Sequence, residues 1–253
     1  MIYTFSKFYY GHVVNSQNNS LDFDEGAGEI NATINSGSYT ITDFATEIKR
    51  VLDTNGTQAY TVSVDRVTRF ITISAAANFD LLFSTGLNNT TSIKSLLGFS
   101  VDVTGTNSYT GTASGSVYSP QRKFQNYLDK QNNKVSINET VHESASGIYE
   151  VISFGNKSFY EFNIDFINEY NQESPSLKKD LSALTNIRNF LDYAITKAEF
   201  EIITDENNVN TFDKVVLEST NYSSNGTGYK LFEMYDKSLN GYYETKLIKL
   251  RVL

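Results

Sequence analysis

Residues 37–99 constrain the fold most, because a helical pattern and a strand pattern follow each other there. Apolar residues recur at helical spacing over 41–53, while charged residues fall on the other side. Thr40 and Asp43 have the spacing of a capping box, and Gly56 ends the pattern because glycine adopts the left-handed conformation at no steric cost. The sequence therefore predicts an amphipathic helix over 41–53. Its apolar stripe consists of Ile41, Phe44, Ala45, Ile48, Val51 and Leu52.

A hairpin is predicted after this helix. Apolar and polar residues alternate over 60–64 and again over 70–74, which is the pattern of two half-buried strands. The polar positions hold mainly Thr and Ser, so the outer face of the hairpin carries little charge. Such a face can be covered by another subunit without stranding a charge, or it can be an ordinary solvated face.

The order of these elements resembles a module of virus structural proteins, most familiar in virion proteins of tailed bacteriophages. The resemblance rests on Gly-Ser-Tyr-Thr at 37–40, the helix, the hairpin, Phe-Asp-Leu-Leu-Phe at 79–83 and Leu-Leu-Gly-Phe at 96–99. It covers about residues 30–103 and depends on order and spacing, since no single element is specific. It implies a structural role in a virion and carries over no catalytic residue.

The second half is similar to phage tail proteins of the tube, baseplate or adaptor kind. Residues 143–150 precede an aromatic strand, and a helix that ends at 189–194 leads directly into a strand at 199–203. The resemblance implies a β-barrel or β-sandwich with one helix.

Periodicity gives further elements in the second half. Aromatic and apolar residues alternate with polar ones at 160–166, the clearest strand of the chain. Ser174 and Pro175 open a helix that is expected over 176–196. Further strands are expected at 212–218, 229–235 and 244–253.

A Gly-, Ser- and Thr-rich stretch at 104–119, ended by Pro120, marks a boundary between domains. We therefore expect a β-rich domain at 1–110, a linker at 111–119 and a second β domain at 120–253. Strands outnumber helices and no βαβ unit repeats. The expected fold class is thus α+β, mainly β, with two domains of barrel or sandwich type that each hold one amphipathic helix.

Composition narrows the possible functions. The chain has 253 residues and no cysteine, which excludes a disulfide framework, a thiol nucleophile and thiolate metal sites. A net charge of -8 disfavours nucleic-acid binding, which needs clustered Lys and Arg, although DNA can still pass through an acidic ring. No stretch approaches the ~20 apolar residues of a membrane span, and no signal-peptide pattern opens the chain.

Candidate catalytic residues are few. His12 and His142 are the only histidines. Ser144, His142 and Glu143 suggest a triad, but residues so close in sequence rarely reach triad geometry. We therefore predict no catalytic residue.

Acidic clusters are the candidate cation sites. Asp22, Asp24 and Glu25 before Gly26 are similar to a calcium loop but lack EF-hand spacing, so a solvated turn is the favoured interpretation. The segment 205–208 is a weaker case of the same kind. We predict no metal site and no cofactor.

Aromatic residues are abundant, with 17 Tyr and 17 Phe but no Trp. Most Phe positions fit a core. Several Tyr lie near expected turns and strand ends, where Tyr is favoured at protein interfaces, whereas a sugar-binding surface usually adds Trp. Subunit contacts are the favoured interpretation for these tyrosines, which are Tyr3, Tyr9, Tyr10, Tyr222, Tyr235, Tyr242 and Tyr243.

Together these features predict a non-enzymatic structural component of a phage virion. Its expected partners are further copies of the chain and other virion proteins, in a ring or complex of the tail, baseplate or neck, assembled in the host cytoplasm without membrane contact. Residues 1–10, 104–119 and 220–228 are expected to lie against neighbouring chains. The alternatives are a receptor-binding or fibre-attachment protein that recognises a host surface glycan, and a hydrolase of a surface polymer.

Overall fold

Strands dominate the fold, which confirms the expected α+β, mainly β class. The strands form open sheets with free end strands, so a closed barrel is not seen in the described part of the chain. The computed structural model describes residues 7–118, 127–143, 149–165, 167–168, 182–205, 208–218, 231–233, 242–245 and 247–253.

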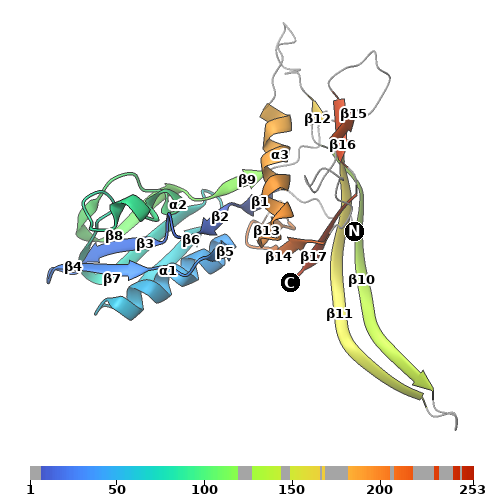
Figure 1. Cartoon of the computed structure of the whole chain (residues 1–253), viewed down its shortest axis with the longest axis horizontal. Coiled ribbons are helices and arrows are strands. Elements are labelled where there is room, and N and C mark those ends of the chain that lie inside the picture. The colour runs from blue at the N-terminus through green and yellow to red at the C-terminus, as the bar shows by residue number, and fades with distance from the viewer. Residues whose placement is uncertain are drawn as a thin grey trace, which may run out of the picture.

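Residues 12–114, which we call the module, form the first unit (Figure 1). Its main sheet is antiparallel, with the order β4-β3-β7-β6 and with β8 along the other side of β7. A short pair, β2 and β5, lies outside this sheet. The strands are β2 (His12–Val14), β3 (Ser20–Asp24), β4 (Glu29–Thr33), β5 (Gly37–Tyr39), β6 (Thr61–Asp65), β7 (Phe70–Leu81) and β8 (Val103–Ala113). The helices are α1 (Ile41–Asn55), a 3-10 turn (Asn89–Thr91) and α2 (Lys94–Leu97).

Helix α1 begins where the sequence predicts. The Thr40 hydroxyl accepts a hydrogen bond from the Asp43 amide at 3.1 Å and donates one to the Asp43 carboxylate at 2.8 Å. This reciprocal capping fixes the first turn. The predicted apolar stripe is buried, and Phe44 in its centre has no exposed surface.

The end of helix α1 differs from the prediction. The helix continues to Asn55 rather than 53, and Gly56 has an extended backbone with φ -86° instead of the expected left-handed conformation. The reason for glycine at this position is steric. A β-carbon would lie 2.5 Å from a Glu25 carboxylate oxygen and 2.9 Å from the Leu52 carbonyl oxygen.

The predicted hairpin is confirmed as β6 and β7, with Ser63 opposite Thr72. β7 continues to Leu81, so most of the Phe-Asp-Leu-Leu-Phe segment belongs to the same strand. Thr61 and Ser63 are exposed, as expected for the hydroxyl-bearing face. The opposite face packs on α1 around the apolar core.

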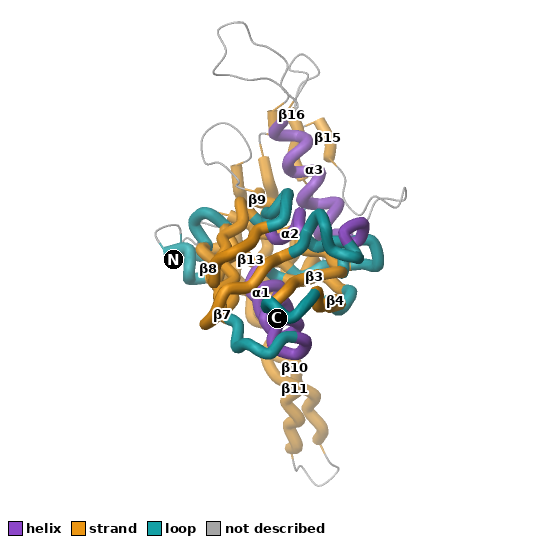
Figure 2. Tube along the Cα trace, turned by 90° about the vertical axis from the view of Figure 1, so that its left-hand side faces the viewer, coloured by secondary structure: helices purple, strands orange, loops and turns teal. Residues whose placement is uncertain are grey.

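The second unit is a seven-stranded antiparallel sheet with helix α3 packed on it (Figures 1 and 2). Its order is β10-β11-β17-β14-β13-β1-β9. A small sheet, β12-β16-β15, accompanies it. The elements are β1 (Lys7–Tyr10), β9 (Ser116–Tyr118), β10 (Tyr127–Glu143), β11 (Tyr149–Asp165), β12 (Ile167–Asn168), α3 (Ser182–Ile195), β13 (Phe200–Ile203), β14 (Phe212–Leu217), β15 (Leu231–Glu233), β16 (Tyr242–Thr245) and β17 (Ile248–Val252).

Several predicted bounds in this unit differ from the structure. The strand expected at 160–166 is the end of a 17-residue strand that begins at Tyr149. The segment 244–253 contains parts of two strands, β16 and β17, rather than one. Of the helix expected over 176–196, residues 176–181 lie outside the described residues.

The module is inserted between two neighbouring strands of the large sheet. β1 pairs antiparallel with β9, with Tyr9 opposite Val117 and Tyr10 opposite Ser116. The chain leaves the large sheet after Tyr10 and returns to it at Ser116. Both connections therefore lie side by side, as Figure 1 shows.

This insertion differs from the expected division into 1–110, a linker at 111–119 and 120–253. Residues 7–10 pair with Phe200–Ile203 far along the chain, and 116–118 form a strand. The backbone supplies the hydrogen bonds of a β ladder, so a Gly- and Ser-rich stretch can be a strand when its neighbour is in place. The two-domain division itself stays a prediction.

Each unit has its own apolar core. In the large sheet, Phe8 of β1 packs on Phe190 of α3 with ring centroids 5.1 Å apart. In the module, Phe44 and Phe79 belong to a separate cluster. Among the described residues, no residue belongs to both clusters. Along the chain, the boundaries between the two clusters fall at residues 11 and 115.

The core also corrects the assignment of two tyrosines to subunit contacts. Tyr9 is 1% exposed and Tyr10 is 8% exposed, so both are buried within their own chain. This also excludes side chains 8–10 from the contact expected at 1–10. The other tyrosines assigned to contacts, and the loop at 220–228, lie outside the residues or side chains that the structure describes.

We predict that Phe44→Ala lowers the free energy of unfolding by about 3–5 kcal/mol, because it leaves a cavity under α1. Phe99, which closes the Leu-Leu-Gly-Phe segment, is only partly buried and stacks on Phe83 with ring centroids 5.0 Å apart. Phe99→Ala should therefore cost less. Urea unfolding of both variants measures the difference, and equal losses would contradict this packing.

Candidate functional site: the junction and the arm

Two chain segments connect the module to the large sheet. Gly11 follows β1 and Gly115 precedes β9, and both have left-handed backbone, with φ 100° and φ 62°. Beyond them, His12 Nε2 lies 2.8 Å from the Ser114 hydroxyl. A β-carbon on Gly115 would lie 2.4 Å from the His12 ring. We call residues 10–12 and 114–116 the neck.

His12 is a buried neutral side chain rather than a surface group. It is 1% exposed, and its ring centroid lies 5.2 Å from that of Phe44. Burial, and to a smaller extent the positive charge of Arg69, lower the pKa of His12 to about 4. Its Nδ1 atom has no hydrogen-bond partner among the described residues. The sequence singled out His12, but its surroundings depend on the distant Ser114.

A buried ion pair joins the module to the large sheet. Arg66, from the turn between β6 and β7, contacts the carboxylate of Glu201 on β13 at 2.5 Å. Their side chains are 8% and 0% exposed. Thr42, at the start of α1, donates its hydroxyl to the same carboxylate at 2.8 Å. The Arg66 guanidinium also lies 3.6 Å from the ring centroid of Phe212 on β14.

Two further contacts surround this pair. The Tyr9 hydroxyl of β1 donates to the Arg66 carbonyl at 2.6 Å. Lys214 on β14 forms an ion pair with Asp43 on α1, and both side chains are about one-third exposed. The junction is therefore polar, whereas the two cores on either side of it are apolar. These residues come from distant parts of the chain, so the sequence contains no local signal for them.

A long hairpin, which we call the arm, extends from the large sheet. β10 and β11 pair from Tyr127 opposite Asp165 to Glu143 opposite Tyr149. β17 pairs only with 159–162 of β11. Among the described residues, 135–143 and 149–158 therefore have only each other as ladder partners. Figures 1 and 2 show this part of the hairpin projecting away from both units.

The arm lacks most devices that protect an exposed strand edge. Proteins usually protect free edges with lysine, proline or bulges. In 135–143 and 149–158 there is no proline, and Lys157 is the only lysine. One register shift lies between Ile137 and Glu139. Within the described residues, the backbone groups at the outer edges of the arm thus have no ladder partner.

The acidic residues considered as a calcium loop are used by the protein itself. Asp22 is 4% exposed and accepts hydrogen bonds from the Asn88 amide at 2.6 Å and the Asn31 side chain at 3.0 Å. Asp24 accepts from two backbone amides of the β3–β4 turn. The expected solvated turn is wrong for Asp22 and Asp24, which lie in β3 with Asp22 buried, because only residues 25–28 form the bend between β3 and β4.

Glu25 illustrates how these carboxylates are stabilised. Burial alone would raise its pKa, but hydrogen bonds from Thr57, Tyr60 and Gln58 together lower the pKa below its ordinary value. The Tyr60 hydroxyl lies 2.8 Å from Glu25, and burial together with this acceptor raises the pKa of Tyr60. The carboxylate therefore ties the end of α1 to β3. No cluster of metal-ligating residues is present in the described ranges.

The remaining candidate residues do not form a site in the described part of the chain. His142 and Glu143 are the last residues of β10, and Ser144 lies outside the described residues. In the acidic segment 205–208, residues 206 and 207 also lie outside them. The Asn208 amide donates to the Asp205 carbonyl at 3.2 Å, as in a turn.

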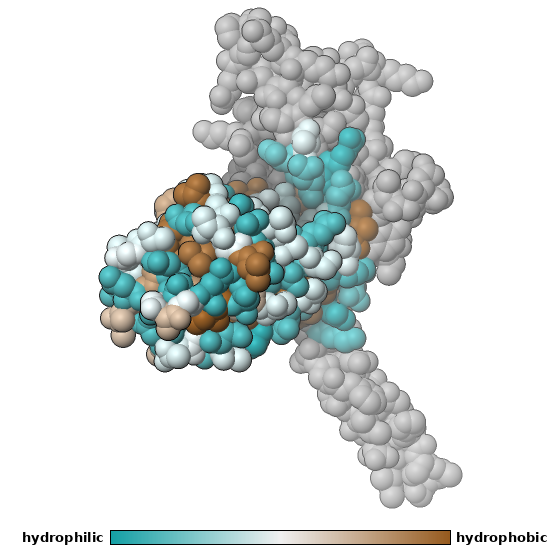
Figure 3. Space-filling model, turned by 60° about the vertical axis from the view of Figure 1, so that its left-hand side comes forward, coloured by the Kyte–Doolittle hydropathy of each residue, from teal (hydrophilic) through white to brown (hydrophobic). Residues whose placement is uncertain are grey.

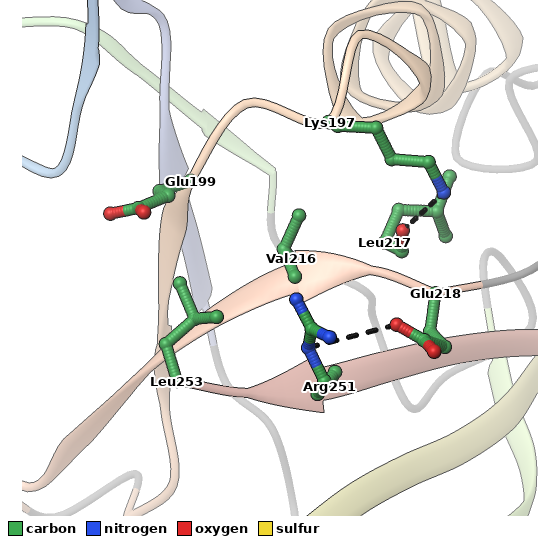
Figure 4. Close-up of a pocket in the computed structure, with 7 residues that line it drawn as sticks. All are labelled: Lys197, Glu199, Val216, Leu217, Glu218, Arg251 and Leu253. Atoms are coloured by element: carbon green, nitrogen blue, oxygen red, sulfur yellow. Dashed lines mark hydrogen bonds and ion pairs between the residues drawn. The ribbon is translucent and has the colours of Figure 1, made fainter.

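A shallow hollow of 350 Å³ lies beside the end of α3 (Figure 4). Three of its charged groups are engaged by neighbours: the Lys197 ammonium donates to the Leu217 carbonyl, and Arg251 Nε lies 3.7 Å from a Glu218 carboxylate oxygen. The lining thus carries side chains of both charge signs. It is lined by Lys197, Glu199, Val216, Leu217, Glu218, Arg251 and Leu253.

The surface of the module is mostly hydrophilic or near neutral on the side seen in Figure 3, with separate hydrophobic spots. On the hydroxyl face of the module, the Thr72 and Thr110 hydroxyls lie 2.9 Å apart. Within the ranges that the structure describes, no helix is both long and apolar enough to span a bilayer.

We predict that Glu201→Gln lowers the free energy of unfolding by about 3–5 kcal/mol, because it leaves Arg66 buried without its counter-charge. Lys214→Met is the matched control and should cost less than about 1 kcal/mol, since its ion pair is partly exposed. Chemical denaturation of both variants provides the comparison. Similar small losses would mean that the Arg66 pair adds little to stability.

We predict that stability falls as the pH decreases from about 6.5 to about 4, by roughly 3 kcal/mol. The unfolded His12 imidazole binds a proton near pH 6.5, whereas the folded one resists protonation until about pH 4. Carboxylates with lowered pKa, such as Glu25, contribute only at lower pH. Denaturation midpoints between pH 7 and 5 should therefore decrease in the native chain and much less in His12→Asn. Parallel curves would contradict this role of His12.

Comparison with known proteins adds no identity. No protein-family model matches the chain, and no curated protein matches it. The junction and the arm are therefore the features from which a function can be inferred.

Proposed function

We propose that this chain is a structural subunit of a phage virion, in which it assembles with further copies of itself and with other virion proteins in a tail, baseplate or neck complex. The arm is the observation that carries the proposal. Its outer part has no ladder partner in the described chain beyond its own two strands. Such an extended element serves contact between molecules better than the stability of one molecule.

The physical reason is the marginal stability of a two-stranded ribbon in water. Such a ribbon needs a third strand or a packed face to be stable on its own. At about 3.3 Å per residue, the segment 135–143 extends about 30 Å past the strands that β17 supports. A neighbouring subunit that pairs with the free edge would supply the missing hydrogen bonds.

Charge does not drive contact between the arm and an acidic subunit. The three glutamates Glu139, Glu143 and Glu150 and the single Lys157 give the arm a net charge of -2, and the whole chain carries -8. A contact through the arm therefore rests on backbone hydrogen bonds at its free edge rather than on charge. The resemblance of residues 30–103 to virion proteins agrees with this role.

A structural role is favoured over an enzymatic one by the use of the polar groups. Buried Asp22 and Glu201 each accept hydrogen bonds from protein donors, which hold loops and units together. Catalytic carboxylates need to face a substrate. We therefore propose that this chain has no enzymatic turnover, no cofactor and no specific affinity for nucleic acid.

We predict that trimming the arm abolishes assembly without unfolding the subunit. Val135 stands opposite Ser158, so an Asn-Gly turn can replace residues 136–157 and close the shortened hairpin. The control variant replaces only 144–148 by the same turn and keeps the paired strands. Light scattering after size exclusion should show the trimmed variant as a monomer and the control as an oligomer. Assembly of the trimmed variant would show that the arm is not the contact.

We also predict that the chain is present in purified particles and that its largest contact there buries about 800 Å² per partner, the size of a stable interface. Mass spectrometry of purified virions tests the first part, and a structure of the assembled particle tests the second. Absence from particles would refute the virion assignment. A particle in which the arm stays exposed would favour the receptor-binding alternative, with binding to a host glycan as its test.

A further inference from the structure

The neck has the geometry of a two-chain hinge. The ladder between β1 and β9 ends with Tyr10 opposite Ser116, and the next residues along the two strands are Gly11 and Gly115. Both glycines have positive φ angles, which side chains with a β-carbon rarely adopt. Backbone rotation at these two neighbouring positions is the simplest way to turn the whole module relative to the large sheet.

Contacts on either side of the hinge are of different kinds. On the module side, Arg69 donates to the Ser114 carbonyl at 3.1 Å and to the Gly115 carbonyl at 2.8 Å. These two bonds hold one strand of the neck and do not join the bodies of the two units. Between the bodies of the two units, the contacts include the buried Arg66–Glu201 pair, the Thr42–Glu201 and Tyr9–Arg66 hydrogen bonds, and the partly exposed Asp43–Lys214 pair. The two apolar clusters share no residue, so no common apolar core fixes the angle between the units.

The Arg66–Glu201 pair is suited to hold the two units in one orientation. It is almost fully buried, so solvent screens it little. Glu201 also accepts the Thr42 hydroxyl, and Arg66 stacks on Phe212, so the geometry is fixed from α1, β13 and β14 together. Ion pairs and hydrogen bonds are directional, which allows them to select one orientation.

We infer that the module is hinged at Gly11 and Gly115 and is held in one orientation on the large sheet by the buried Arg66–Glu201 pair. Loss of this pair frees the module to adopt several orientations while both units stay folded. The inference rests on the junction alone and is independent of the assembly proposed for the arm.

The chain is well suited to a distance measurement, because it contains no cysteine. Ala76 on β7 and Asn189 on α3 are exposed, so Ala76→Cys and Asn189→Cys place one spin label on each unit. Double electron–electron resonance on this doubly labelled full chain, in the arm-trimmed background if the chain assembles, then reports the distribution of orientations. The parent should give one narrow distance distribution.

Glu201→Gln should broaden the distribution at least twofold, because the neutral amide no longer holds the guanidinium. Glu47→Gln is the matched control. It removes the charge from an ion pair with Arg50 that lies within α1 of the module, and Glu47 is likewise buried. This control should keep the narrow distribution even if it lowers stability.

Arg66→Lys provides a milder variant, should Glu201→Gln fail to fold. It keeps the positive charge but loses the planar stacking on Phe212 and the bonds that the guanidinium makes in parallel. We expect an intermediate width. A narrow distribution in whichever of the two variants folds, or a broad one in the parent, would overturn the inference. Equal broadening in Glu47→Gln would do so as well, because the effect would not be specific to the junction.

Discussion

The pairing of β1 with β9 is the constraint on which the rest of the structure depends. It brings residues 7–10 and 116–118 together at the end of the seven-stranded sheet, and everything between them must fold outside that sheet. Because the entry and exit of the module are neighbours, the module can keep a core of its own. The same pairing brings Gly11 next to Gly115 and His12 within reach of Ser114.

The polar character of the junction follows from this arrangement. The apolar clusters of the two units share no residue, and the contact between the units combines the buried Tyr9 side chain with the directional Arg66–Glu201 pair. A buried ion pair is poor evidence for stability in itself, since desolvation offsets much of the attraction. The pair contributes specificity instead. The Glu201 carboxylate is fully bonded only in the orientation that brings both Arg66 and Thr42 to it.

The arm is the other consequence of strand pairing. The residues of β11 that pair with β17 continue the large sheet, while the rest of the hairpin leaves it. An unpaired sheet edge of that length promotes aggregation of a monomeric protein, whereas it provides a contact surface in a protein that assembles. The junction acts within the chain, whereas the arm is the element that we propose makes contacts between chains.

The sequence by itself determined the local elements of this protein. Helix α1, its Thr40 cap, the β6–β7 hairpin and the Thr and Ser of its outer face follow from periodicity and capping chemistry, which depend on residues a few positions apart. The mainly β class follows from the same patterns. His12 was noticed only because histidines are rare in the chain.

Only the tertiary structure decided which strands meet. Nothing near Lys7–Tyr10 indicates that its partner is Phe200–Ile203, and nothing in the Gly- and Ser-rich 104–119 distinguishes a linker from a strand. Backbone hydrogen bonds are the same for every sequence, so a ladder between distant segments leaves no local pattern. For the same reason, the pairing of Arg66 with Glu201, which are 135 positions apart, is visible only in the tertiary structure.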